Sequence, residues 1–165
     1  EIHRILVPLD FSPASDRALA YAAALAEEFG APLFLLHVIE DRLMTGPWPS
    51  EVYLGELPKL RDDLIKDAER RMRLSLEALE KDGLTATGEV IIGGPSHVII
   101  EQAAAINADL LVMGTHGRTG ITHLLIGSVA ERVIRHAPCP VFIVRERKAA
   151  EATAVPAVAK GVVVV

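Results

Sequence analysis

A glycine-rich segment, residues 114–128, carries the residue pattern best suited to chemistry. It reads GTHGRTGITHLLIGS, follows the apolar run 109–113 and precedes the helical pattern 129–134. Glycine tolerates positive φ and has no side chain, so successive backbone N–H groups can converge on one anion. A helix beginning just beyond Gly127 would add unpaired N–H donors and the positive end of its dipole. The segment therefore predicts a loop able to hold a phosphate chain.

Known phosphate motifs do not describe this loop. No Gly-x4-Gly-Lys-Ser/Thr occurs in the chain, which excludes a P-loop. Gly114, Gly117 and Gly120 are spaced by three and follow a late strand, which is not the dinucleotide fingerprint. On the glycines alone, a phosphate loop and an ordinary tight turn are equal alternatives.

The elements that would position this loop are predicted by hydrophobic periodicity. Buried strands are expected where short apolar runs occur, at residues 5–9, 32–38, 85–92, 109–113 and 141–144. Helices are expected between them, at residues 13–29, 57–82, 98–106 and 128–136. This alternation predicts an α/β domain, an open five-stranded parallel sheet with helices on both faces. A strand order of 3-2-1-4-5 would make it a Rossmann-like nucleotide-binding fold with strands one and four beside the ligand crevice.

Helix ends are marked by capping residues. Ser12 and Pro13 fit the N-cap and first position of the first helix, and Gly30 fits its C-terminal cap. Gly83 ends the second helix. The sheet-facing side chains of the first helix are expected to be Ala18, Ala22, Leu25, Ala26 and Phe29, and those of the second Leu57, Leu60, Leu64, Ala68, Met72, Leu76 and Leu79. Gly93-Gly94-Pro95-Ser96 is expected to be a strand-to-helix turn with Ser96 or Pro95 at the helix start, and a second anion-binding nest is the alternative.

Composition limits the function classes. The chain has 165 residues and a formal net charge of −5, which argues against binding nucleic acid or acidic membranes. Cys139 is the only cysteine, which excludes an internal disulfide and a cysteine-based metal site and fits a reducing compartment. No apolar run approaches the roughly 20 residues of a membrane span. We expect a cytoplasmic protein with one domain at 1–145 and a valine-rich tail, 146–165, whose order the sequence leaves open.

A longer pattern is more specific than the glycines alone. It comprises Gly114-x2-Gly117-x9-Gly127-Ser128, the early stretch RILVPLDFS at 4–12, Leu36-His-Val38 and Pro138-Cys-Pro-Val141. Together these motifs closely resemble the universal stress protein family over roughly residues 2–145. Within that family the glycine pattern marks the ATP-binding branch. The resemblance also implies a five-stranded parallel sheet and a homodimer through the fifth strand, 141–144.

The resemblance implies an ATP site with two ends. Asp10 would accept hydrogen bonds from ribose hydroxyls, and Val38 backbone groups would read the adenine edge. The residues implied at the nucleoside end are Pro8, Asp10, Val38, Met113 and Gly114. Those implied at the phosphates are Gly117, Arg118, Gly127, Ser128 and Val129, with His116 touching phosphate or ribose.

Simpler roles remain open for several of these residues. Asp10 is also typical of a turn acid or a local N-cap partner, and Ser128 of a plain helix cap. Arg118 could point to solvent, and His116 could be a surface turn residue.

Catalysis is weakly supported by the sequence. No base is evident beside the γ-phosphate, as phosphoryl transfer would require. We therefore expect an ATP-binding regulatory or stress-response protein with little or no hydrolysis. The alternatives are a slow ATPase and a dimeric interaction module that does not use nucleotide. The histidines lack metal-ligand spacing, so any Mg²⁺ would arrive with ATP, held by the phosphates and by Asp10 or water.

Overall fold

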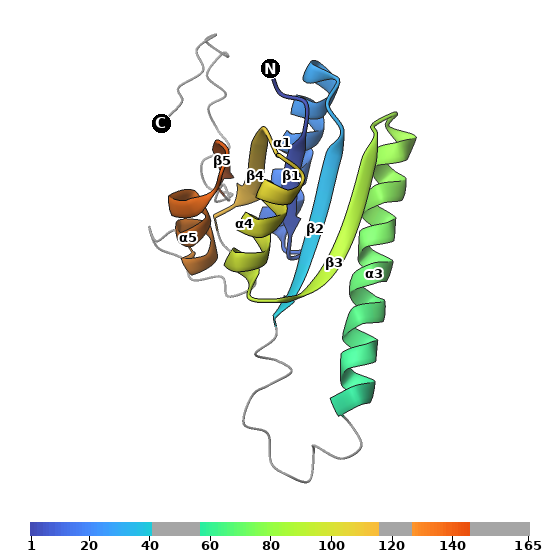
Figure 1. Cartoon of the computed structure of the whole chain (residues 1–165). Coiled ribbons are helices and arrows are strands. Elements are labelled where there is room, and N and C mark those ends of the chain that lie inside the picture. Colours follow the sequence, from blue (N-terminus) through green and yellow to red (C-terminus); the bar gives the residue numbers. More distant parts are fainter. Residues whose placement is uncertain (41–56, 116–126, 146–165) are drawn as a thin grey trace, which may run out of the picture.

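The computed structural model describes residues 1–40, 57–115 and 127–145, which form one parallel sheet covered by helices on both faces (Figure 1). The strand order is β3-β2-β1-β4-β5, and the predicted 3-2-1-4-5 order is confirmed. The elements in chain order are β1 (Ile5–Leu9), α1 (Pro13–Phe29), β2 (Leu33–Glu40), α3 (Leu57–Lys81), β3 (Ala86–Gly93), α4 (Pro95–Ala105), β4 (Leu110–Gly114), α5 (Ser128–His136) and β5 (Val141–Val144).

The central strands β1 and β4 are apolar throughout, as expected for strands that pack against helices on both sides of the sheet. Alternate residues of β1 enter two different cores. Ile5 and Val7 belong to the core that includes side chains of α1 and α3, whereas Leu6 joins the core formed with α4 and α5. The central strands β1 and β4 therefore lie between the two helical layers, and their carboxyl ends share one edge of the sheet.

The predicted helix ends are confirmed at α1. Ser12 is the N-cap, Pro13 is the first helical residue, and Gly30 closes the helix in the left-handed conformation with φ of 62°. The Gly30 N–H donates to the carbonyl of Ala26. Gly83 follows α3 with φ of 79°, a conformation that a side chain would strain.

The sequence predictions were wrong at several helix positions. Phe29 and Leu60 were expected against the sheet, yet they are 49% and 45% exposed. Phe29 is the final residue of α1, and Ala26, three residues earlier, is the last side chain of this helix that is buried. Leu60 lies in the first turns of α3, which extend past the strand ends (Figure 1), so no strand lies beneath it. Helix α4 begins at Pro95, which confirms the expected helix start at Pro95 or Ser96 and lies ahead of the stretch 98–106, because proline suits the first helical position.

Some predictions fall on residues that the structure does not describe. They concern His116, Gly117 and Arg118 in the glycine segment and the tail 146–165. The assignment of one domain to 1–145 stays a prediction. Within the described ranges, no helix is long and apolar enough to cross a membrane.

Candidate functional site

A cavity of about 580 Å³ lies where the carboxyl ends of β1, β2 and β4 meet the first turns of α1, α4 and α5. Its volume falls within the roughly 300–1,000 Å³ typical of small-molecule sites. Every described residue of the predicted site lines this cavity, namely Pro8, Asp10, Val38, Met113, Gly114, Gly127, Ser128 and Val129. The fold thus brings together residues that are up to about 120 positions apart in the chain.

Asp10 directly follows β1 and is held by the start of α1. Its Oδ1 accepts hydrogen bonds from the Ser12 backbone N–H at 3.0 Å and from Ser12 Oγ at 2.5 Å. Asp10 therefore does act as a local partner of the α1 N-cap, which is one of the simpler roles that the sequence left open. The same residue lines the cavity, so one carboxylate both supports the loop after β1 and faces the site.

The first turn of α1 is capped by its own side chains. Ser12 Oγ accepts from the Ser15 backbone N–H at 3.3 Å, and Ser15 Oγ accepts from the Ser12 backbone N–H at 3.1 Å. This reciprocal pair is a capping box, which satisfies two donors that the helix itself leaves unpaired. Both serines are buried. Two backbone N–H donors at the start of α1 therefore already have side-chain acceptors within the protein.

The first turn of α5 is arranged differently. Gly127 is its N-cap, and this glycine has no side chain that could accept a hydrogen bond from the first turn. The Gly127 N–H donates to the carbonyl of Thr115 at 2.9 Å, which ties the helix start to the end of β4. Ser128, Val129 and Ala130 then line the cavity. Since the first N–H groups of a helix have no partner within it, α5 offers donors and a positive dipole end to an anion.

Gly114 at the end of β4 has a packing reason to be glycine. A Cβ atom there would lie 3.0 Å from the backbone of Ala14 in α1. The absent side chain lets the first turn of α1 approach β4 closely. The predicted place beneath a ribose is compatible with this contact, because Gly114 also lines the cavity.

Sequence reasoning missed an aromatic pair in the cavity wall. Phe11 has φ of 59°, and its ring centroid lies 4.5 Å from that of the buried His37. His37 Nδ1 donates to the carbonyl of Leu9 at 2.7 Å, its register partner on β1. The pairing of Leu9 with His37 follows from strand register. The signal available in the sequence was only that Phe11 adjoins Asp10 and that His37 adjoins Val38.

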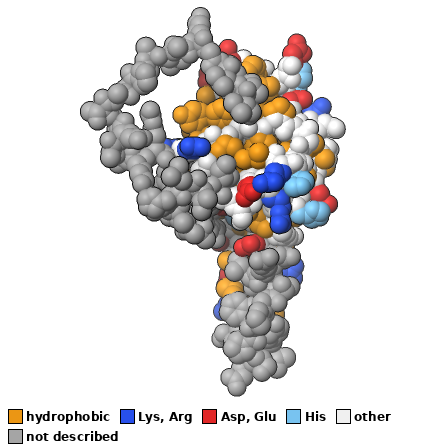
Figure 2. All heavy atoms as spheres, turned by 90° about the vertical axis from the view of Figure 1, so that its left-hand side faces the viewer, with side chains coloured by type: hydrophobic (Ala, Val, Ile, Leu, Met, Phe, Trp, Pro, Cys, Tyr) orange, Lys and Arg blue, Asp and Glu red, His pale blue; other side chains and the backbone are white. Residues whose placement is uncertain are grey.

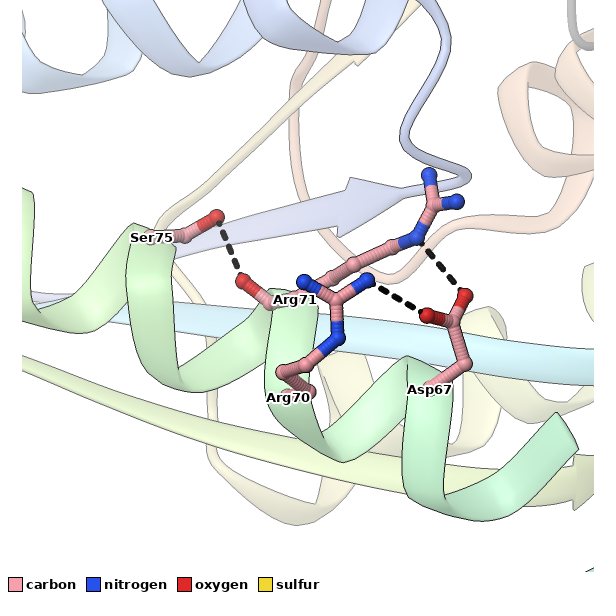
Figure 3. A network of polar contacts seen from close by, with 4 residues as sticks. All are labelled: Asp67, Arg70, Arg71 and Ser75. Carbon is pink, nitrogen blue, oxygen red and sulfur yellow. Dashed lines mark hydrogen bonds and ion pairs between the residues drawn. The ribbon is translucent and has the colours of Figure 1, made fainter. Parts of the chain in front are cut away.

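Helix α3 forms one wall of the cavity, whereas the sequence predicted only that its apolar face packs in the core. Leu64, Asp67, Ala68 and Arg71 line the cavity. Asp67 accepts from Arg70 Nη2 at 2.7 Å and from Arg71 Nε at 2.8 Å (Figure 3). The hydrogen bond from Arg70 is the main cause that lowers the pKa of Asp67 below its ordinary value. The helical spacing of this face was visible in the sequence, but its proximity to the loop after β1 was not.

Two other polar positions lie away from this cavity. Burial raises the pKa of the half-buried Cys139 thiol, which makes it a poor nucleophile at neutral pH. Asp109 precedes β4 at the opposite edge of the sheet and accepts from the His3 backbone N–H at 2.9 Å. That hydrogen bond lowers the pKa of Asp109. Among the described residues, no cluster of three or more metal-ligating side chains occurs.

Comparison with known proteins identifies the family. A model of the universal stress protein family matches residues 1–145. The chain belongs to the universal stress protein family. One member, from Methanocaldococcus jannaschii, is 34% identical over 145 residues, which cover 88% of this chain and 83% of the relative.

Solved structures of family members share the fold. The universal stress protein UspA of Lactobacillus plantarum superposes with a TM-score of 0.77 at 28% identity, covering 88% of this chain and 99% of that one. Another universal stress protein, solved in complex with cAMP, has a TM-score of 0.64 at 26% identity and covers 87% of this chain and 97% of that one.

Proposed function

We propose that this universal stress protein binds an adenine nucleotide, with ATP as the first candidate, and acts as a nucleotide-dependent regulatory or stress-response protein. One observation carries the proposal. The N-cap of α5 is Gly127, which supplies no side-chain cap, and the first turn of this helix lines the same cavity as every described residue of the predicted site. A relative that binds cAMP supports the adenine nucleotide as ligand class.

The two ends of the ligand follow from the two sides of the cavity. The phosphates would lie at the first turn of α5, where backbone N–H groups and the helix dipole favour negative charge. The ribose would lie by Asp10 above Met113 and Gly114, and the adenine by Pro8 and Val38. The glycine segment would complete the phosphate end with Gly117, Arg118 and His116.

Binding with little or no hydrolysis is the expected activity. Mg²⁺ would accompany the phosphates of ATP. Binding can then stabilise one form of the protein in proportion to nucleotide concentration. The chain's own contribution is to hold the phosphates and orient the nucleoside.

Isothermal titration of the full chain with Mg-ATP tests this proposal. We expect saturable binding at sub-millimolar nucleotide, and mass analysis of denatured protein should release an adenine nucleotide. Absence of binding in this range, with no nucleotide released, would contradict the proposal and favour the interaction module.

We also propose a homodimer through the edge strand β5. Phe142 on this strand is 42% exposed and lies against Tyr21 of α1, which is 53% exposed, at a ring-centroid distance of 6.0 Å. Figure 2, which faces the β5 side of the sheet, shows hydrophobic side chains gathered on this face. An uncovered apolar edge strand tends to pair with another chain. Light scattering at micromolar concentration should give the dimer mass, and a monomer would contradict the proposal.

A further inference from the structure

One face of α3 borders the cavity beside the nucleoside end. The lining residues Leu64, Asp67, Ala68 and Arg71 are spaced by three and four, so they share one side of the helix. Phe11, which adjoins Asp10 in the chain, lies beneath Arg71 of this face, and His37, which adjoins Val38, lies against Phe11. The α3 face is therefore separated from the phosphate end at α5 by the carboxyl ends of the strands.

The guanidinium of Arg71 is held in a defined place. Its Nε donates to Asp67 Oδ2 at 2.8 Å, and its Cζ lies 5.7 Å from the ring centroid of Phe11. Phe11 in turn stacks on His37. Figure 3 shows the Arg71 side chain reaching from α3 toward the loop after β1. Within the described part of the chain, the terminal amino groups of Arg71 make no hydrogen bond, so these donors are available to a ligand.

The arrangement is poorly explained by stability alone. Arg71 and Asp67 are 46% and 44% exposed, and exposed ion pairs contribute little to folding. Phe11 beneath Arg71 takes a positive φ, a strained conformation that tends to occur at ligand sites. Asp67 is shared by Arg70 and Arg71, so the three side chains together carry one net positive charge beside the cavity.

We propose that Arg71 is a specificity-determining residue that donates hydrogen bonds to the nucleoside of the bound nucleotide. The inference rests on the proposed nucleotide site and adds a contact from α3 to it. The acceptors are a purine ring nitrogen or a ribose oxygen, and Asp67 positions the guanidinium. Arg suits this role because its planar fork presents fixed donors while one nitrogen and one face are already engaged.

The neighbouring arginine provides a matched control. Arg70 binds the same carboxylate from the same helix, yet it does not line the cavity. We expect R71M to weaken ATP binding about tenfold, as for loss of a charge-assisted hydrogen bond. R70M should stay within about twofold of the wild type. Titration calorimetry of the full chains measures both, and circular dichroism melts check that both variants are folded.

R71K separates charge from geometry. It keeps the positive charge and loses the planar fork, so we expect it to bind ATP nearly as weakly as R71M. Equal affinities of R70M and R71M, or wild-type affinity in R71K, would overturn the role of Arg71 and leave the nucleotide site standing. A wild-type chain that binds no ATP would instead overturn the proposed function as well.

Discussion

Three helix starts border the cavity, and two of them, those of α1 and α5, differ in which groups satisfy their backbone N–H donors. At α1, Ser12 and Ser15 cap each other's backbone N–H groups, and Asp10 accepts from Ser12. At α5, Gly127 provides no side-chain acceptor. Both helices begin at the carboxyl ends of neighbouring strands, so position in the fold does not cause the difference. The residue at the N-cap does.

The difference indicates how stability and binding are divided. A serine N-cap contributes about 1 kcal/mol relative to alanine, so α1 gains folding free energy from its own side chains. The glycine N-cap of α5 costs only about 0.3 kcal/mol relative to serine, and it leaves the backbone donors of the first turn for an external anion. The capped start of α1 also holds Asp10 in place at the cavity. The start of α1 therefore positions a side chain of the site, whereas the backbone N–H groups at the start of α5 are donors for a ligand.

The largest effect is expected when α5 receives a cap of its own. Gly127→Asp places an acceptor and a negative charge at the phosphate end. We expect ATP binding to weaken about thirtyfold, from competition for the donors and repulsion of phosphate. Because glycine is itself a tolerable N-cap, the unfolding free energy should rise by roughly 0.3 kcal/mol, which raises Tm by about 1 °C. Calorimetric titration and thermal melting measure the two changes.

Gly94→Asp is the matched control for that variant. Gly94 is the N-cap of α4, also without a side-chain hydrogen bond, and a Cβ atom there meets nothing within 4 Å. The variant should gain similar stability and keep ATP affinity within about threefold. If Gly127→Asp and Gly94→Asp weaken ATP binding equally, the start of α5 is not the phosphate site.

A smaller effect is expected when α1 loses its cap. Ser12→Ala removes the acceptor for Ser15 and the donor to Asp10 Oδ1. The unfolding free energy should fall by about 1 kcal/mol, measured by urea denaturation. ATP affinity should fall less than in the α5 variant, because the lost bonds are internal. Ser75→Ala, on the exposed face of α3, should change stability by less than about 0.5 kcal/mol. A larger loss of ATP affinity in Ser12→Ala than in Gly127→Asp would contradict the assignment of the phosphates to the start of α5.

The smallest effect concerns pH and lies away from both helix starts. Arg70 and Arg71 lower the pKa of Asp67 below its ordinary 3.8. A group whose pKa is lowered by folding contributes stability above its unfolded pKa and loses it as pH falls through the folded value. The stability difference between the wild type and Asp67→Asn should therefore shrink below about pH 4. Urea midpoints measured from neutral to acid pH check this, and a difference that grows on acidification would contradict it.

The sequence was sufficient for the strand order, and the described residues that it proposed for the site line one cavity. Continuous apolar runs specify strands covered on both faces, and Ser12, Pro13 and Gly30 mark the ends of α1. Parallel strands then bring their carboxyl ends together, which explains why distant residues such as Asp10 and Ser128 share one cavity.

What the sequence could not provide was the extent of the sheet and the contacts across it. Helical periodicity tells which side of a helix faces the sheet but not where the sheet ends, so Phe29 and Leu60 were misplaced. The stack of Arg71, Phe11 and His37 joins three elements through long side chains. No local pattern encodes such a contact, because it depends on register and on the path of the loop after β1.

The most direct test of the account is a titration of the isotope-labelled chain with Mg-ATP, followed by the backbone amide signals of the two helix starts. The amides of Ser128, Val129 and Ala130 should shift strongly as the phosphates bind, while that of Ser15, already donating to Ser12, should move little. Large shifts at the start of α1 with none at the start of α5 would contradict the claim that α5 holds the phosphates.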